Sequence, residues 1–584
     1  MLLVVMLSAS VRFSIYSIKY QRHQKHEILN GELRNRFEFQ LLGFSAFIIW
    51  AFPPCSLVER SRNLEHGGNA HLDFIRALVQ IRICGTHGAI KPMFCAGKRP
   101  NETIEKVDDF CCMGRRKKMV VENVTILAIA DKGQALARID DVVTFVKGVV
   151  PGDVCDIMIK RKRKNYWEGH VMKITELSPI RIEAKCKYFG VCGGCKWQNL
   201  SYEKQLEFKQ KQVNDALQRI GKVEVGAFEP ILGSENVFNY RNKLEFSFSH
   251  RRWLTQEEVE SGKVFEDVPS LGFHVPGRWD KVLDVEECHL MAEPSNGIRN
   301  RVREIALAND FSYYNLNAQT GFLRNLIVRS TMMNDWMVIL SVAEDNPNAI
   351  KLILDTLAEE FPQLTSVLYV INDKPNDTIA DLDIQVHSGN DYIMEEMEGL
   401  KFRVGPKSFY QTNGPQAYEL YKITRDFAGL TGNEVVYDLY TGTGTIAQFV
   451  AKQAKKVVGI EYVEPAIVDA KLNAELNGIE NTSFYAGDMK DVFTKELVAK
   501  EGHPDVVITD PPRAGMHGDV VARLNELLPQ RIVYVSCNPA TQARDVQLLS
   551  ENYEVKKVRP LDMFPHTHHV ESVVLLERRV ISEE

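Results

Sequence analysis

Cys537 stands where a thiol could act as a nucleophile. It follows Ile532–Ser536, an apolar run that predicts a short buried β-strand, and it precedes the chain-breaking pair Asn538 and Pro539. Open α/β sheets bind their ligands beyond the carboxyl ends of strands, which is where this pattern puts the thiol. A lone cysteine is more often a small buried core residue. Its chemistry therefore depends on what the rest of the chain supplies.

Two carboxylates lie next to the ends of predicted strands in the same part of the chain. Asp510 directly follows the apolar strand Val506–Thr509, and Glu571 precedes the strand Val573–Leu576. Glu571 lies between the apolar Val570 and the strand that starts at Val573, and burial would raise its pKa toward neutrality, where a carboxylate works as a general base. The alternative interpretation is a surface glutamate at a strand end.

A regular β-α-β pattern begins at Val435. Its first strand ends in Asp438 and leads into the turn Gly442-Thr-Gly444-Thr445, and a second strand ends in Glu461. The turn lacks the third glycine of the dinucleotide fingerprint, and Asp438 would repel a diphosphate. The two carboxylates favour a cofactor with an amino acid and a nucleoside but no phosphate, which indicates S-adenosylmethionine. An unrelated α/β fold with structural carboxylates is the alternative.

Length and composition limit the number of domains and the class of protein. The 584 residues predict about three or four domains. With 45% hydrophobic residues, 25% charged residues and a net charge of −6, the chain is globular, and any basic surface must be local. Its 11 cysteines are too few and too clustered for a secreted disulfide framework, so we expect a reducing, cytoplasmic compartment and no membrane association.

The first 112 residues differ from the remainder of the chain in their sequence pattern. Leu41–Val58 is long enough to suggest a membrane span, but Pro53 and Pro54 interrupt it. Met113–Met119 resembles a basic N-terminus from which a well-patterned protein starts. We therefore expect residues 1–118 to be a disordered extension or an over-called start.

Residues 119–183 alternate short apolar runs with turn signals. Five short strands in this length predict a small closed barrel of the oligonucleotide-binding kind. The basic run Lys160–Lys164 lies beside Tyr166 and Trp167, which combines cations for phosphates with aromatic rings for bases. A solvated hairpin tip would look similar. The segment resembles a TRAM domain, a small RNA-binding barrel.

Three cysteines with C-x5-C-x2-C spacing, Cys186, Cys192 and Cys195, indicate a metal site. A tetrahedral zinc or an iron–sulfur cluster needs a fourth ligand, for which Cys288 is the better candidate. Cys155 is the other candidate, but it lies on a predicted barrel strand and belongs to the core. The spacing alone does not separate zinc from iron–sulfur.

The middle of the chain, residues 184–400, predicts an α+β domain. Ser201–Ile220 has the pattern of an amphipathic helix with Lys209 exposed, and strands follow from about Tyr240 to Gly399. Arg241 and Lys243 alternate with apolar residues, so they face either a phosphate backbone or solvent at a sheet edge.

Five motifs together carry a family resemblance. They are Phe409–Asn413 around Gln411, Asp438–Gly444, Asp510-Pro-Pro-Arg513, Ser536–Pro539 and Pro565–Glu571. In this order, over about residues 120–580, the chain resembles the RNA uracil-5-methyltransferases, most closely the type that modifies 23S rRNA. Thr441 and Thr445 stand where the family often has cysteine and asparagine, and the Thr445 hydroxyl can still form a hydrogen bond with the cofactor.

The resemblance implies an α/β protein with a TRAM barrel (119–183), a central iron–sulfur domain (184–400) and a Rossmann-like methyltransferase domain (401–584). In this scheme Cys537 adds to carbon 6 of uracil, Glu571 removes the proton from carbon 5, and Asp510 orients the base. The implied S-adenosylmethionine site consists of Gln411, Tyr440, Thr445, Glu461, Asp488 and Asp510. The resemblance also implies a [4Fe–4S] cluster, with Cys186, Cys192, Cys195 and Cys288 as its ligands.

The implied partner is RNA, with 23S rRNA the first choice, and the implied assembly is a monomer. A tRNA uracil-5-methyltransferase and an RNA cytosine-5-methyltransferase are the alternatives among enzymes. An RNA-binding iron–sulfur protein with a retired active site is the alternative from another class, and intact Cys537 and Glu571 argue against it.

Overall fold

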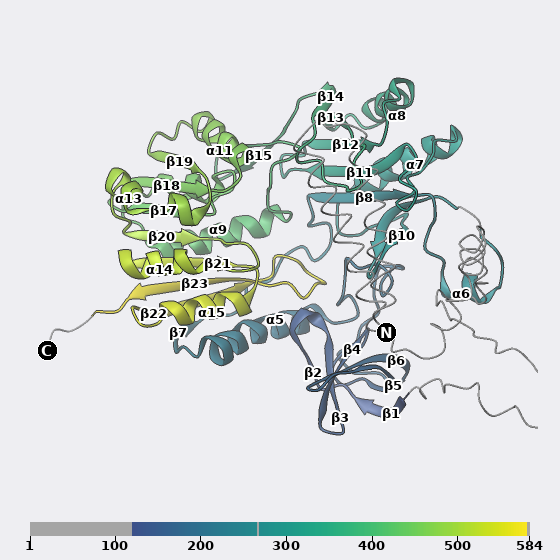
Figure 1. Cartoon of the computed structure of the whole chain (residues 1–584), viewed down its shortest axis with the longest axis horizontal. Helices are drawn as coiled ribbons and strands as arrows, with labels where there is room; N and C mark the ends of the chain where they lie inside the picture. The colour runs from purple at the N-terminus through teal and green to yellow at the C-terminus, as the bar shows by residue number, and fades with distance from the viewer. Residues whose placement is uncertain (1–118, 266–267, 581–584) are drawn as a thin grey trace, which may run out of the picture. The chain divides into compact units, whose positions relative to one another are not determined.

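The computed structural model describes residues 119–265 and 268–580 (Figure 1). The expected N-terminal extension lies outside the described residues. Within them, no helix has the length and apolar character that crossing a membrane requires.

The N-terminal described segment is a six-stranded β-sheet with the strand order β1-β5-β6-β4-β3-β2. Five strands were predicted, and the sixth is the two-residue β2, too short to leave an alternating pattern. Its interior holds Val146, Ile157 and Cys155, so Cys155 is a core residue as predicted. The strands and one short helix are β1 (Met119–Thr125), β2 (Ala128–Ile129), η1 (Asp131–Gly133), β3 (Ala135–Ile139), β4 (Val142–Lys147), β5 (Val154–Lys162) and β6 (Trp167–Glu176).

The middle segment forms a seven-stranded sheet in the order β10-β9-β8-β11-β12-β13-β14, in which only β12 and β13 pair in parallel. Helices α7 and α8 pack on it through a shared apolar core. Its elements are β8 (Lys243–Ser249), α6 (Gln256–Glu260), β9 (Ser270–Val275), β10 (Arg278–Asp284), α7 (Ser295–Ala308), β11 (Leu323–Ser330), β12 (Trp336–Val342), α8 (Pro347–Glu360), β13 (Leu364–Ile371) and β14 (Ile384–Gly389). A separate hairpin follows, β15 (Ile393–Met397) and β16 (Leu400–Val404).

The C-terminal segment is built on an eight-stranded sheet in the order β19-β18-β17-β20-β21-β23-β22-β7. The first five strands in this order are parallel, and β23 runs antiparallel to both β21 and β22. The strands are β7 (Val225–Phe228), β17 (Val435–Leu439), β18 (Lys456–Glu461), β19 (Thr482–Ala486), β20 (Val506–Thr509), β21 (Arg531–Ser536), β22 (Tyr553–Leu561) and β23 (Glu571–Arg578).

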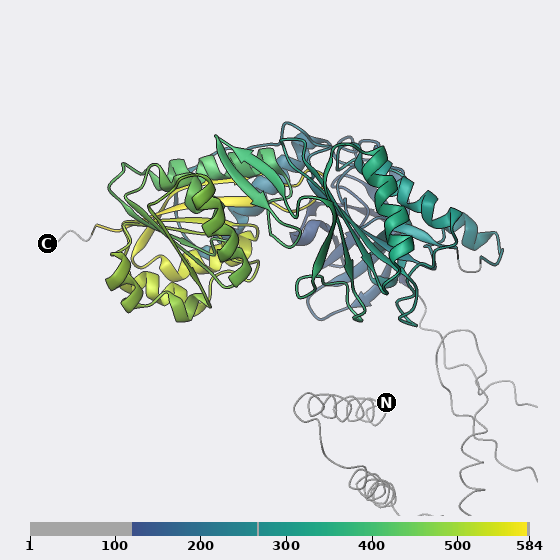
Figure 2. The ribbon, with the colours of Figure 1, turned by 90° about the horizontal axis from the view of Figure 1, so that it is seen from above.

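Helices cover both faces of this sheet, as the view in Figure 2 shows. One apolar core joins the sheet to α9, α10 and α11, and a second joins it to helices that include α5, α14 and α15. The helices are α5 (Tyr202–Ala216), η2 (Leu217–Gly221), α9 (Gly414–Ala428), α10 (Thr445–Ala451), α11 (Glu464–Leu476), α12 (Met489–Val492), α13 (Lys495–Glu501), α14 (Gly518–Leu527) and α15 (Pro539–Leu549). Helix α5 and strand β7 precede the central sheet in sequence. Helix α5 nevertheless packs on the C-terminal sheet, and β7 pairs with β22 at its edge.

Candidate functional site

The two candidate catalytic residues and the candidate base-orienting residue Asp510 lie at one edge of the C-terminal sheet. Asp510 follows the end of β20, and Cys537 follows the end of β21, just before the Asn538 cap of α15. Glu571 is the first residue of β23, and Ser572 pairs with Ser536. Because β23 runs antiparallel to β21, its beginning lies beside the end of β21. The topology therefore brings together residues that are far apart in the sequence.

Burial is the main influence on the pKa values of the two carboxyl groups at this edge. Glu571 is only 5% exposed, so the surface interpretation of this glutamate is wrong. Burial, reinforced by the charge of Asp510, raises the pKa of Glu571 to about 8. Burial alone raises the pKa of Asp510 to about 7. Two carboxyl groups with pKa values near neutrality are suited to holding or moving a proton.

Arg513 is a functional candidate to which the sequence alone assigned no role. Burial, followed by the charges of Glu571 and Asp510, raises the pKa of the Cys537 thiol to about 11. Arg513 opposes this shift through its charge and a hydrogen bond to Cys537, and its charge also lowers the pKa of Glu571. Its place in the Asp-Pro-Pro-Arg motif, directly after the acidic strand end, was the available signal.

The cofactor candidates Tyr440, Thr445 and Glu461 lie around the glycine-rich turn between β17 and α10. Glu461 ends β18, where its carboxylate accepts hydrogen bonds from the backbone N–H groups of Gly442 (3.1 Å) and Val463 (2.9 Å). Tyr440 has a left-handed backbone with φ of 65°, which is uncommon outside glycine. Thr445 begins α10 and is buried. The turn is thus fixed around a carboxylate that remains partly exposed.

Asp488 and Gln411 come from two further loops. Asp488 follows β19 and caps α12 by accepting from the N–H of Lys490 (3.2 Å). Gln411 lies between β16 and α9, where its carbonyl accepts from the side chain of Asn242 (2.9 Å). The buried Arg329 donates to the carbonyls of Gly405 (2.7 Å) and Ser408 (3.1 Å), which fixes the start of this loop.

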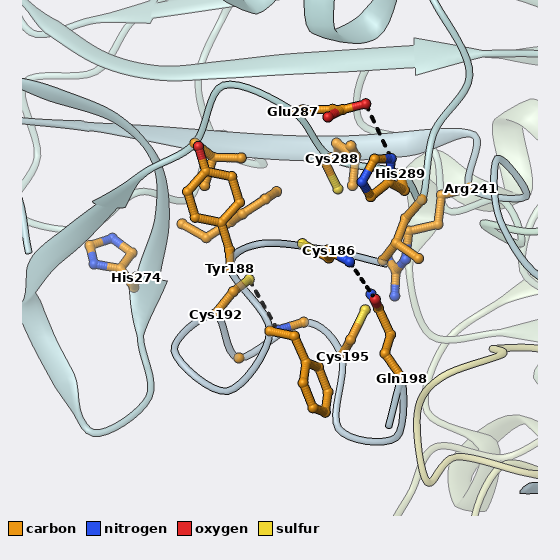
Figure 3. A pocket seen from close by; sticks show the side chains of 17 residues that line it. Cys186, Tyr188, Cys192, Cys195, Gln198, Arg241, His274, Glu287, Cys288 and His289 are labelled. Atoms are coloured by element: carbon orange, nitrogen blue, oxygen red, sulfur yellow. Dashed lines mark hydrogen bonds and ion pairs between the residues drawn. The ribbon is translucent and has the colours of Figure 1, made fainter. Parts of the chain in front are cut away.

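The four candidate cluster cysteines line one cavity of about 390 Å³ (Figure 3). Cys186, Cys192 and Cys195 come from the loop before α5, and Cys288 comes from the loop after β10. Burial raises the pKa of Cys195 to about 12, with smaller contributions from the charges of Cys192, Cys288 and Cys186. Among the described residues, no group of three or more His, Cys, Asp or Glu side chains is arranged to hold a metal ion. The four cysteines therefore share one cavity, and their side chains do not form a metal site in this arrangement.

The basic run of the barrel forms an exposed hairpin end between β5 and β6. Lys160–Lys164 are all exposed, and the ammonium of Lys162 lies 3.8 Å from the ring centroid of Trp167. This surface offers cations and an aromatic ring in the combination predicted for nucleic-acid binding.

Known proteins support the methyltransferase interpretation. Residues 383–579 match the model of the tRNA (Uracil-5-)-methyltransferase family, and residues 115–172 match that of the TRAM domain. An uncharacterized RNA methyltransferase of Bacteroides thetaiotaomicron is 58% identical over 77% of this chain and 100% of its own length. Another, from Porphyromonas gingivalis, is 55% identical over 78% of this chain and 99% of its own length.

A solved structure gives the same result for the fold. The Pyrococcus abyssi tRNA (uracil-54, C5)-methyltransferase in complex with S-adenosyl-L-homocysteine is 30% identical, with a TM-score of 0.60 over 78% of this chain and 100% of that one. The α/β fold of the C-terminal segment is therefore that of the class I methyltransferases. The chain belongs to the S-adenosylmethionine-dependent RNA uracil-5-methyltransferase family and carries a TRAM domain.

Proposed function

We propose that this protein methylates carbon 5 of a uridine in 23S rRNA, with Cys537 as the nucleophile and Glu571 as the general base. The observation that carries the proposal is the convergence of Cys537, Asp510 and the buried Glu571 at one sheet edge. Family membership favours uracil over the cytosine-5 alternative.

The residues around the glycine-rich turn suit the methyl donor. Glu461 is held by two backbone N–H groups, which leaves its carboxylate oriented to accept from ribose hydroxyls. Tyr440, Thr445, Asp488 and Gln411 complete the proposed S-adenosylmethionine site. When bound, this cofactor supplies an electrophilic methyl group on a positively charged sulfur.

Carbon 5 of uracil is too weak a nucleophile to take that methyl group directly. The Cys537 thiolate would form a bond to carbon 6, and the resulting enolate could take the methyl group at carbon 5 while the sulfur–methyl bond of the donor breaks to leave a neutral thioether. The Glu571 carboxylate then takes the proton from carbon 5, and the bond between carbon 6 and sulfur breaks to restore the thiolate. Arg513 favours the thiolate before addition, and Asp510 orients the base through its N3–H group.

Carbon 6 is not accessible within a base stack, so the target uridine must be unpaired or turned out of its helix. The exposed hairpin end at Lys160–Lys164 is the proposed contact for the RNA around it.

We further propose that Cys186, Cys192, Cys195 and Cys288 hold a [4Fe–4S] cluster. Four thiols that line one cavity are the ligand set that such a cluster requires, and this arrangement supports the proposal. Anaerobically purified protein should contain iron and absorb visible light, and Cys192→Ser should lose both. Cys155→Ala, which changes a cysteine of the barrel core, is the matched control and should keep them. Zinc without iron would overturn the assignment.

Mapping of 5-methyluridine in a deletion strain tests the substrate. A single 23S rRNA position should lose its methyl group and regain it on expression of the wild-type protein, but not of Cys537→Ala. The Pyrococcus abyssi relative acts on tRNA, which supports tRNA as the second candidate. Loss confined to tRNA would replace rRNA by that candidate.

A further inference from the structure

The loop that leads to Glu571 is a buried segment without regular secondary structure. It runs from Asp562, after β22, to Val570, before β23. His566, at its middle, has a left-handed backbone with φ of 64° and is only 5% exposed. Such a loop keeps one conformation only when other parts of the protein fix it. We call residues 562–570 the base loop.

Helix α5 contacts the base loop through two buried side chains. The carboxamide oxygen of Gln205 accepts from the N–H of His566 (2.8 Å), and its nitrogen donates to the carbonyls of Trp197 (3.0 Å) and Leu200 (2.9 Å). Lys209 pairs with Asp562 (2.5 Å) and donates to the carbonyl of Phe564 (3.0 Å). Gln205 and Lys209 are both fully buried, so water does not compete for these bonds.

The segment before α5 holds the same loop from its backbone. The N–H groups of Lys196 and Trp197 both donate to the carbonyl of His566, at 2.8 and 3.0 Å. Lys196 directly follows Cys195, which lines the cysteine cavity. Gln205 therefore binds both partners of this contact, the base loop and the residues after the cysteines.

We propose that Gln205 is a positioning residue, which fixes the base loop so that the Glu571 carboxylate meets the proton on carbon 5. Lys209 supports the same loop at its start. The inference rests on the proposed function, because it assigns Gln205 a role in the step that Glu571 performs. It places one part of the catalytic geometry in a helix whose Gln205 lies 361 residues before His566 in sequence.

The test separates formation of the protein–RNA adduct from its release. Protein is mixed with methyl-labelled S-adenosylmethionine and an unmodified transcript, either 23S rRNA or tRNA according to the deletion strain. Denaturing gels then follow the labelled adduct and the labelled free RNA. Gln205→Leu should slow release by about 10- to 100-fold, the cost of displacing a catalytic group by about 1 Å, and change adduct formation by less than about threefold.

Gln210→Leu is the matched control. Gln210 lies on the same helix, but its side chain accepts from the N–H of Ile231 (2.8 Å), which is outside the base loop. It should leave both steps unchanged. If Gln205→Leu does not fold, Gln205→Glu serves instead, since it keeps the acceptor for His566 and loses the amide donors. That variant should slow release by at least about threefold.

The inference is overturned if the folded Gln205 variant releases RNA at the wild-type rate, or if it slows both steps equally, as a general loss of structure would. Glu571→Gln distinguishes this outcome from failure of the proposed function. Failure of Glu571→Gln to accumulate adduct removes the proposed function itself. Accumulation in Glu571→Gln without slow release in the Gln205 variant removes only the positioning role.

Discussion

Removal of the carbon-5 proton should slow steeply as the pH falls below about 8. Only the ionised form of Glu571 can accept a proton, and burial with the nearby Asp510 charge raises the pKa of this carboxyl from 4.5 to about 8. About half of the molecules carry the carboxylate at pH 8, and about 1 in 100 at pH 6. The rate constant of this step should therefore fall by about 50-fold between the two.

The addition step should respond differently to pH. Burial and the neighbouring carboxylates raise the pKa of Cys537 to about 11, so the thiolate fraction keeps increasing above pH 8. Proton removal should level off once Glu571 is ionised. The two steps can thus be assigned by the pH at which each becomes constant.

A doubly labelled single-turnover experiment measures both steps. The transcript carries tritium on carbon 5 of uridine, and S-adenosylmethionine carries a ¹⁴C-methyl group. Methyl transfer reports the steps before proton removal, tritium release reports proton removal, and the excess of methyl over released tritium is the adduct. Both rate constants should fall from pH 8 to pH 6, and above pH 8 only the rate constant for tritium release should level off.

The Asp510→Asn variant tests whether ionisation of Glu571 causes the pH dependence of tritium release. Removing a like charge lowers the pKa of the remaining carboxyl, so the midpoint for tritium release should move to lower pH. Asp519→Asn changes an exposed aspartate on α14 and should not move it. A rate constant for tritium release that varies by less than about threefold from pH 6 to 8 would refute the reasoning.

Three further predictions concern stability, cofactor and RNA. Lys209→Met should lower the free energy of unfolding by about 3–5 kcal/mol in urea denaturation, because it leaves Asp562 buried and unpaired. The double variant Lys209→Met/Asp562→Leu should recover at least half of this loss. If it recovers none, the ion pair does not account for the loss. Glu461→Gln should weaken S-adenosylmethionine binding by about 10- to 100-fold in calorimetry, because it removes charge-assisted hydrogen bonds, and a change below about threefold would argue against a ribose contact. Lys160→Ala and Lys164→Ala should each reduce the slope of log K against log salt by about 0.7–0.9 in filter binding, and an unchanged slope would exclude phosphate contacts there.

Local sequence patterns predicted the parallel strands of the C-terminal sheet because their apolar runs are continuous and end at turn signals. The predicted strand at 532–536 is β21, Arg531–Ser536, and the predicted strand at 506–509 is β20. The first residues after parallel strands share one sheet edge, so the grouping of Asp510 with Cys537 could be anticipated. The entry of Glu571 at the same edge depends on the reversed direction of β23, which no local pattern records.

Lys209 is a residue whose burial the amphipathic pattern of its helix did not predict. Its place in a charged amphipathic helix predicted an exposed side chain, and that prediction is wrong because the side chain is fully buried against Asp562. The partner lies 353 residues away in sequence, so helix periodicity cannot reveal it. The same holds for Gln205, whose partner His566 is 361 residues distant. Contacts of this kind appear only once the fold brings α5 to the base loop.

The most direct measurement of the central claim uses a transcript made with 5-fluorouridine. Fluorine on carbon 5 leaves no proton for Glu571 to remove, so the adduct should stop after methyl transfer. Mass spectrometry of the digested wild-type protein should find a methylated fluorouridine on the peptide that contains Cys537. A covalent nucleotide on any other cysteine, or complete methylation without an adduct, would contradict the account.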